Sequence, residues 1–304
     1  MIGVKLTSVK WERRTYSMNY KIISDSSSNL MQMEGVPFES VPLKIVAGDK
    51  EYIDDATLDL ANMVGDLKKY KGKSGSSCPN VGEWLDAFGD AENVFCVTIT
   101  KNLSGSYNAA VQACADYVEE HPDRKAYVFD SLSAGPELAM IANKIRELAE
   151  AGKSFEEIRD EVLDYHNHLH TIFCLESLTN LSRNGRVNPA VAKIASALGI
   201  RMVGAAIGGT IQPLAKPRGE KKALEAMLNQ MEQRGLYDGA EVRIAHCYNR
   251  VGALELKELI QRKYPNCKFI IEHTTGLCSY YAEVGGFIVG YGGKYNTENL
   301  NHEH

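Results

Sequence analysis

Apolar strands that end in hydroxyl-rich turns are the feature that most constrains how this chain can fold. Three such strands are predicted in the first half, at Tyr20–Ile23, Val94–Thr98 and Ala126–Phe129. The turns that follow them are Ser24–Ser28, Thr100–Ser106 and Asp130–Gly135. Helical sequence continues at Leu103–Glu120 and Pro136–Ala151. Repeated strand–turn–helix units predict an α/β domain with a mainly parallel sheet and helices on both faces.

The second half of the chain has a different pattern. Ser154–His170 is predicted as a helix, and Lys71–Ser77 earlier in the chain as a loop. Met202–Ile207 and Thr210–Leu214 flank a Gly-Gly pair, which indicates a hairpin. We therefore expect a second α/β domain with mixed or antiparallel strands. The expected division is an N-terminal extension at 1–19, domains at 20–164 and 165–304, and a ligand site between the two domains.

The composition excludes several classes of function. The chain has 304 residues, a formal net charge of −5 and no long basic block, so no nucleic-acid partner is indicated. No apolar run reaches the length of a membrane span, and no secretory signal is visible. Seven cysteines occur without a CxxC pair, which fits a reducing compartment better than disulfides or zinc. We expect a cytoplasmic protein without an integral membrane segment.

The hydroxyl-rich turns are candidates for an anion site. Loops after the carboxyl ends of parallel strands gather at one edge of the sheet, where ligands bind. Helix N-termini there favour an anion. Serine is also a common N-cap, so one such turn alone is more often a helix cap than a ligand site. Thr100, Ser104 and Ser106 exceed what one cap requires, and Ser74–Pro79 is a similar stretch. Neither a P-loop nor a G-x-G-x-x-G pattern occurs, so a single carboxylate fits better than a polyphosphate.

The histidines allow two interpretations. His273 ends a predicted strand and precedes Thr274-Thr275-Gly276, so it either completes a carboxylate site or is a surface or capping residue. His166 and His170 stand at i and i+4 of a predicted helix, but no HExxH pattern accompanies them. We expect no metal site.

Taken together, these stretches resemble the DegV family of bacterial fatty-acid-binding proteins, over Tyr20 to Tyr291. The family motifs correspond in order to Ser24-Asp25-Ser26, Ser76-Ser77-Cys78-Pro79-Asn80, Leu103-Ser104-Gly105-Ser106-Tyr107, Asp130-Ser131, Asn184-Gly185-Arg186, Lys216-Pro217-Arg218-Gly219 and His273-Thr274-Thr275-Gly276. Two departures stand out. Cys78 replaces the glutamine of the second motif, and the GPG expected after the late histidine is absent.

The resemblance implies a carrier and not a catalyst, without a cofactor. A long-chain fatty acid would lie between the domains, with its acyl chain in an apolar tunnel. Its carboxylate would be held by Ser76, Ser77, Ser104 and His273. Arg218 would face a partner or the phosphoryl group. That partner would be an ATP-dependent fatty-acid kinase that makes acyl phosphate for phospholipid metabolism.

Two alternatives stay open at the level of sequence. A serine hydrolase acting on acyl esters would use Ser104 as nucleophile, His273 as base, and Asp25 or Asp130 as the third member. Against it, Leu103-Ser104-Gly105 lacks the G-x-S-x-G elbow. A sugar or small-acid binder could use the same hydroxyls in a shorter, more polar pocket.

Overall fold

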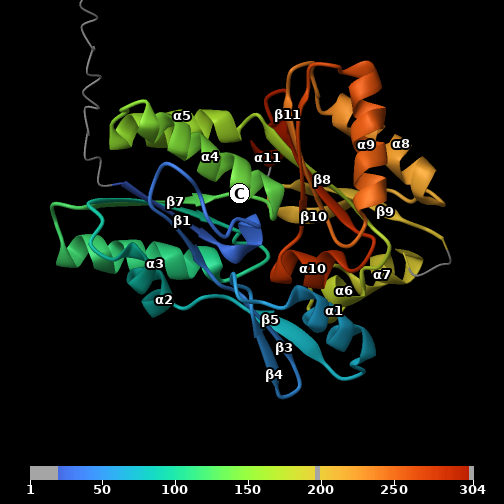
Figure 1. The fold of residues 1–304 in the computed structure, drawn as a ribbon, viewed down its shortest axis with the longest axis horizontal. Helices are drawn as coiled ribbons and strands as arrows, with labels where there is room; N and C mark the ends of the chain where they lie inside the picture. The colour runs from blue at the N-terminus through green and yellow to red at the C-terminus, as the bar shows by residue number, and fades with distance from the viewer. Residues whose placement is uncertain (1–19, 196–198, 301–304) are drawn as a thin grey trace, which may run out of the picture.

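The computed structural model describes residues 20–195 and 199–300, so the N-terminal extension expected at 1–19 lies outside the described residues. Within the described part, the strands form three sheets, and helices surround the two larger ones (Figure 1). The order of these two sheets is β2-β1-β6-β7 in the first and β10-β9-β8-β13-β11-β12 in the second. A small sheet of order β4-β3-β5 accompanies them.

The first sheet is parallel throughout, as predicted. Its strands are β1 (Tyr20–Asp25), β2 (Phe38–Val41), β6 (Asn93–Thr98) and β7 (Lys125–Asp130). One face packs on α4 (Pro136–Glu150) and α5 (Phe155–His166), and the other on α2 (Val81–Phe88) and α3 (Ser106–Glu120). Ile22 faces the first pair of helices and Ile23 the second, because side chains alternate along a strand. The prediction of helices on both faces is confirmed.

The second sheet is mixed, also as predicted. Only β11 and β12 pair in parallel, and the other neighbours are antiparallel. Gly208 and Gly209 close the β9–β10 hairpin with φ of 55° and 71°, a backbone region that favours glycine. The strands are β8 (Leu169–Leu175), β9 (Met202–Ile207), β10 (Thr210–Ala215), β11 (Glu241–His246), β12 (Lys268–His273) and β13 (Phe287–Gly292).

Helices cover both faces of this sheet, and one of them reaches the first sheet as well. α8 (Glu220–Gln233) and α9 (Arg250–Lys263) pack on one face. α4 contacts β8, β11 and β13 on the second sheet as well as β1 and β6 on the first, so it joins the two (Figure 1). The short helices are α6 (Thr179–Arg183), α7 (Pro189–Ala195), α10 (Gly276–Ala282) and α11 (Thr297–Leu300), with a 3₁₀ turn at Ser26–Ser28.

The prediction of a single helix over Ser154–His170 is wrong in its last part. The helix α5 ends at His166, and β8 begins at Leu169. All residues of β8 are buried, because the strand lies between β9 and β13 with both faces covered. A strand buried on both faces shows no polar alternation, so its sequence is easily assigned to the preceding helix. The domain boundary expected at 164/165 stays a prediction.

The small antiparallel sheet is absent from the sequence-based expectations. It consists of β3 (Lys44–Ala47), β4 (Lys50–Ile53) and β5 (Ser74–Ser77), and α1 (Leu60–Lys69) lies between the last two in sequence. The predicted loop at Lys71–Ser77 is therefore wrong from Ser74 onward. Serine and glycine have low strand propensity, and pairing with the apolar β3 decides the conformation here.

Candidate functional site

A largely apolar cavity lies where the turns of the first sheet meet the second sheet and α10. Its empty space is about 830 Å³, a volume that includes open solvent at its mouth. Aliphatic and aromatic side chains from both halves of the chain line it, among them Leu43, Ile99, Leu132, Phe173, Leu277 and Ile288. Such a lining suits a long apolar ligand.

Four polar side chains converge on one part of this cavity: Ser76, Ser104, Arg186 and Tyr281. The Ser76 and Tyr281 hydroxyls are 2.8 Å apart and hydrogen-bonded. Arg186 Nε donates to the Leu103 carbonyl oxygen at 3.1 Å, which places the guanidinium next to Ser104. A group of hydroxyl and guanidinium donors inside an apolar cavity is suited to the head of an amphipathic anion.

The strand β5 explains why only one of the two predicted serines of its motif lines the cavity. Ser74 and Ser76 point inward, where their hydroxyls contact Tyr280 and Tyr281, each at 2.8 Å. Ser77 is exposed and does not line the cavity, because neighbouring side chains of a strand point to opposite faces. The predicted loop gave no reason to distinguish Ser76 from Ser77, whereas the strand places their side chains on opposite faces.

The turn before α3 divides its hydroxyls between structure and cavity. Ser106 Oγ donates to the buried Asp25 carboxylate at 2.7 Å, and Ile99 N donates to the same carboxylate at 2.9 Å. Burial raises the pKa of Asp25, although the hydrogen bonds from Ser27 and Ser106 oppose that shift. Ser104, two residues earlier, lines the cavity. Asp25 therefore holds two strand-end turns together and leaves Ser104 for a ligand.

A glycine allows the two serine motifs to approach each other. A Cβ atom at Gly105 would lie 3.1 Å from Cys78 Sγ, a tight contact. The cysteine that replaces the family's glutamine thus packs against the turn that carries Ser104, and not against the cavity.

Arg186 has no acidic partner among the described residues. Over residues 20–195 and 199–300, the ion pairs within 4 Å include none of Arg186; its guanidinium donates to the carbonyl oxygens of Leu103 and Asn184. Burial raises the pKa of Tyr281, so its hydroxyl stays protonated and able to donate. A half-buried cation without a counterion is costly, and a ligand carboxylate would relieve that cost.

Sequence reasoning assigned no role to Arg186 or Tyr281. The Gly-Arg turn was visible as a motif, so Arg186 could have been found as a cation close to a glycine turn. Tyr281 has no local signal, because it enters the site only through the packing of α10 against β5.

The other predicted site residues lie elsewhere. His273 is exposed at the end of β12, where its ring centre is 4.2 Å from that of His246 and 5.6 Å from that of Tyr248. It does not line the cavity. Arg218 is exposed immediately before α8 and is likewise outside the lining. The structure therefore brings Ser76 and Ser104 together, and places Ser77, His273 and Arg218 apart from them.

The helix N-terminus that follows His273 is occupied by a side chain of the protein. Asp54 accepts hydrogen bonds from Gly276 N at 2.6 Å and Leu277 N at 2.8 Å, and burial raises its pKa to about 6. This contact ties the end of β4 to α10. The backbone N–H groups of this late motif therefore bind an internal carboxylate in place of a ligand.

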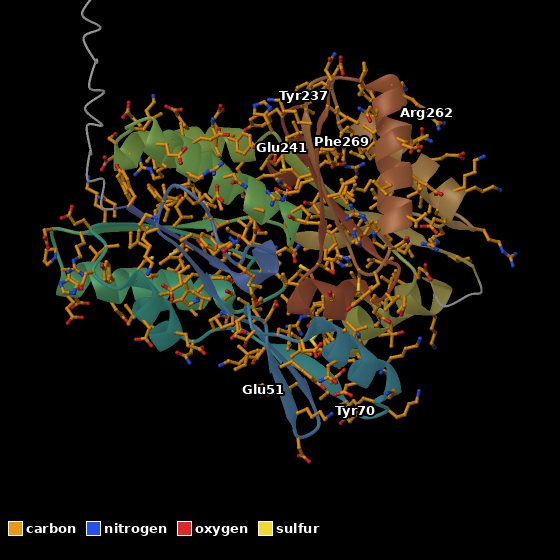
Figure 2. All side chains as sticks on the ribbon, in the orientation of Figure 1. Glu51, Tyr70, Tyr237, Glu241, Arg262 and Phe269 are labelled. Carbon is orange, nitrogen blue, oxygen red and sulfur yellow. The ribbon has the colours of Figure 1, made fainter. Side chains whose placement is uncertain are left out.

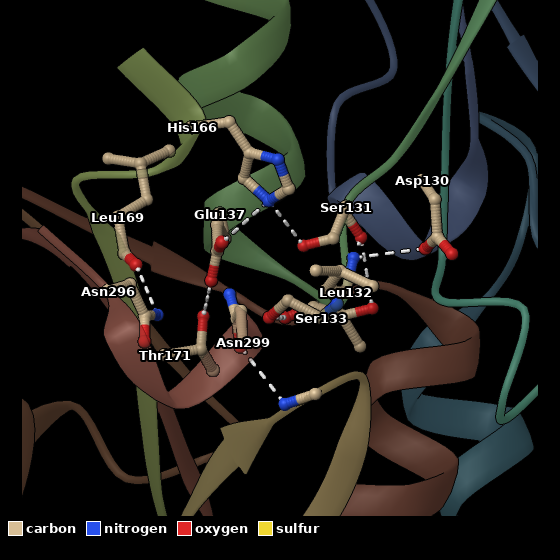
Figure 3. A network of polar contacts seen from close by, with 12 residues as sticks. Asp130, Ser131, Leu132, Ser133, Glu137, His166, Leu169, Thr171, Asn296 and Asn299 are labelled. Carbon is tan, nitrogen blue, oxygen red and sulfur yellow. Dashed lines mark hydrogen bonds and ion pairs between the residues drawn. The ribbon is translucent and has the colours of Figure 1, made fainter. Parts of the chain in front are cut away.

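A second polar group borders the cavity and consists of partnered residues (Figure 3). Thr171, which lines the cavity, donates to Glu137 Oε2 at 2.6 Å. His166 Nε2 faces both Glu137 Oε1 at 3.4 Å and the Ser131 carbonyl oxygen at 2.9 Å, so this nitrogen carries the proton. Burial alone would lower the pKa of His166, but the Glu137 carboxylate raises it overall. This network links α4, α5 and β8.

The described residues do not place a base beside Ser104. Among the described residues, no histidine or carboxylate is hydrogen-bonded to Ser104, whose hydroxyl accepts from Ser106 N at 3.3 Å. Asp25 is engaged with Ser27, Ile99 and Ser106. A nucleophilic serine needs a base within hydrogen-bond reach.

Metal and membrane signals are also absent from the part of the chain that the structure describes. No group of three or more histidine, cysteine or acidic side chains is placed to hold a metal ion there. None of the helices in that part is long and apolar enough to cross a bilayer.

Comparisons with known proteins show which proteins this chain is similar to. The family described as "Uncharacterised protein, DegV family" matches residues 19–291. A DegV domain-containing protein of Streptococcus gordonii is 39% identical over 279 residues, which cover 90% of this chain and 99% of that protein. These matches span nearly the whole described chain.

Two of the similar solved structures contain a bound fatty acid. A DegV family protein from Eubacterium eligens loaded with heptadecanoic acid matches with a TM-score of 0.88 and 39% identity, covering 90% of this chain and all of that one. The Streptococcus pneumoniae Fatty Acid Kinase (Fak) B3 protein loaded with linoleic acid matches with a TM-score of 0.88 and 38% identity, covering 90% and 99%. By sequence and by fold, this chain belongs to the DegV family.

Proposed function

We propose that this protein binds a long-chain fatty acid in the apolar cavity and holds its carboxylate with Ser76, Ser104, Arg186 and Tyr281. The observation that carries this proposal is the unneutralised Arg186 beside two serine hydroxyls at one part of an otherwise apolar cavity. The ligands of the two similar solved structures support the same chemistry.

The physical division of labour follows from the ligand. Burial of the acyl chain contributes roughly 0.8 kcal/mol per methylene, so the tail supplies most of the affinity. The head supplies orientation and selectivity, because an unpaired carboxylate in a desolvated site would be costly. Arg186 provides the opposite charge, and the hydroxyls satisfy the remaining lone pairs.

Two sequence-based assignments remain predictions in this scheme. Ser77 and His273 lie outside the cavity, and the family resemblance is their only support. The His273→Ala variant tests the histidine directly. A several-fold loss of fatty-acid affinity would support the assignment, and unchanged affinity would remove His273 from the site.

We further propose that the bound acid is presented to a fatty-acid kinase, so that this chain acts as a carrier and the partner performs the chemistry. The name of the Streptococcus pneumoniae protein supports this partnership. Arg218 is exposed and free of ion pairs among the described residues, which suits contact with a partner or a phosphoryl group. An Arg218→Ala variant should bind fatty acid normally but support less acyl-phosphate formation when a cognate kinase is supplied.

Mass spectrometry of small molecules extracted from freshly purified, denatured protein tests the proposal first. We expect a long-chain fatty acid at close to one equivalent per chain. If the extract stays empty even after incubation with a fatty-acid mixture, the cavity binds something else and the proposal fails. Release of acid from added acyl esters would instead indicate the hydrolase.

A further inference from the structure

A second concavity lies on the other side of α6 and α10 from the apolar cavity. Leu277 and Tyr281 of α10 line the apolar cavity, whereas Tyr280 and Glu283 line this second cleft. α1 lies beside α6 and α10 (Figure 1), and its residues Val64, Leu67 and Lys68 line the cleft from the opposite side. The cleft holds about 1150 Å³ of empty space that includes open solvent. It is therefore a separate, solvent-accessible site, with the two helices as partition.

The partition is braced, so the two sites do not merge. The Tyr280 hydroxyl is hydrogen-bonded to Ser74 Oγ at 2.8 Å and receives a bond from Asn184 Nδ2 at 2.9 Å. The rings of Tyr280 and Tyr281 pack edge to face with centres 4.8 Å apart. Tyr280 thus stays on the cleft side while its neighbour stays on the cavity side.

Three cations line the cleft: Lys68 and Lys71 from the end of α1 and beyond it, and Arg183 from α6. All three are exposed, and none takes part in an ion pair among the residues the structure describes. Tyr70, between the two lysine positions, marks this wall at the lower edge of the molecule (Figure 2). The cleft therefore concentrates positive charge from two separate elements.

The acidic residues of the cleft do not neutralise these cations. Glu176 pairs with Arg201 at 2.5 Å. Glu283 accepts hydrogen bonds from Ser177 Oγ at 2.9 Å and Asn180 N at 3.1 Å. Glu176 is therefore neutralised by Arg201, whereas Glu283 keeps its charge, and the three cations of the lining outnumber this one unpaired carboxylate.

We propose that this cleft binds a small molecule that carries a di- or triphosphate group. A compact group with several negative charges can contact cations from both walls at once, whereas a single carboxylate would engage one of them. Arginine binds phosphate oxygens through two parallel N–H groups, and lysine adds point charges. The proposal goes beyond the binding of a fatty acid and does not depend on it, because the partition separates the two sites.

Calorimetric titration with pyrophosphate at low ionic strength tests the proposal. We expect saturable binding that weakens with added salt, since exposed charges are screened. Lys68→Gln, Lys71→Gln and Arg183→Gln should each reduce the affinity roughly threefold to tenfold. Lys69→Gln is the matched control, because Lys69 is a neighbouring exposed lysine of α1 that does not line the cleft. Removal of the fatty acid should leave pyrophosphate binding unchanged.

Several outcomes would overturn the proposal. They are no saturable binding of pyrophosphate, or an equal loss of affinity in the Lys69→Gln control. Binding of phosphatidylglycerol vesicles without binding of soluble pyrophosphate would assign the cations to a membrane surface. Binding of poly-glutamate that is as tight as that of pyrophosphate, and equally sensitive to the three substitutions, would assign them to an acidic protein. Circular dichroism of each variant confirms that the fold is intact.

Discussion

Two polar groups border the same apolar cavity, and they differ in whether their members have partners. In the Glu137 network, Thr171 donates to the carboxylate and His166 bridges the carboxylate and a carbonyl oxygen. In the group around Arg186, the guanidinium contacts carbonyl oxygens but no acidic side chain in the described part of the chain. A fully partnered polar group stabilises the fold, and an incompletely neutralised one is available to a ligand.

The largest expected effect tests the structural half of this comparison. Glu137→Ala leaves buried His166 and Thr171 without their common acceptor, so the free energy of unfolding should fall by about 3–5 kcal/mol. Glu147→Ala in the same helix is the control, because Glu147 forms only a surface pair with Lys144 at 3.6 Å and should cost less than about 1 kcal/mol. Urea denaturation measures both. Equal losses would contradict the structural role.

The second prediction tests the ligand half. Arg186→Met removes the charge without orphaning a buried acid, so stability should change little. Fatty-acid affinity should fall by about 1.5–3 kcal/mol, roughly tenfold to a hundredfold. A fatty alcohol of equal chain length separates head from tail: the wild type should prefer the acid, and the variant should bind both alike. If the variant keeps the preference, Arg186 does not hold the carboxylate.

A smaller effect is expected for single hydroxyls, and neighbouring serines provide the control. Ser76→Ala should weaken fatty-acid binding by about 1.5 kcal/mol, the lower end of the range for one hydrogen bond to a charged group. Ser77→Ala makes the same chemical change on the exposed face of β5 and should have no effect. Titration of both variants with one fatty acid decides the matter. Comparable losses would mean that both serines reach the ligand, as the sequence alone suggested.

The smallest effect concerns protonation of the structural network. The pKa of His166 is raised in the folded state, so His166 binds its proton more tightly in the folded protein than in the unfolded chain. Stability from this group is fully present below the usual histidine pKa of about 6.5 and is lost as pH rises through the folded value. The denaturation midpoint of the wild type should therefore fall as the pH rises through this range. The His166→Gln variant should show a flatter profile, and an identical slope would exclude His166 as its source.

Local sequence patterns predicted part of the architecture. Strand–turn–helix repetition predicted the parallel sheet, and the glycine pair at 208 and 209 predicted the β9–β10 hairpin; both are confirmed. These features depend on side-chain periodicity and on backbone freedom at glycine, which short segments contain. The strand β8 was missed because burial on both faces removes the polar alternation that marks a strand.

The candidate site was likewise predictable only in part. The hydroxyl-rich turns after the strands, and the resemblance of their motifs to one family, could be recognised from the residues alone. Which hydroxyls are available depends on packing: Asp25 engages Ser106, the pleat of β5 separates Ser76 from Ser77, and α10 brings Tyr281 to Ser76. The physical reason is that the availability of a polar group depends on whether segments distant in sequence supply its partner, and that is settled only when they pack together.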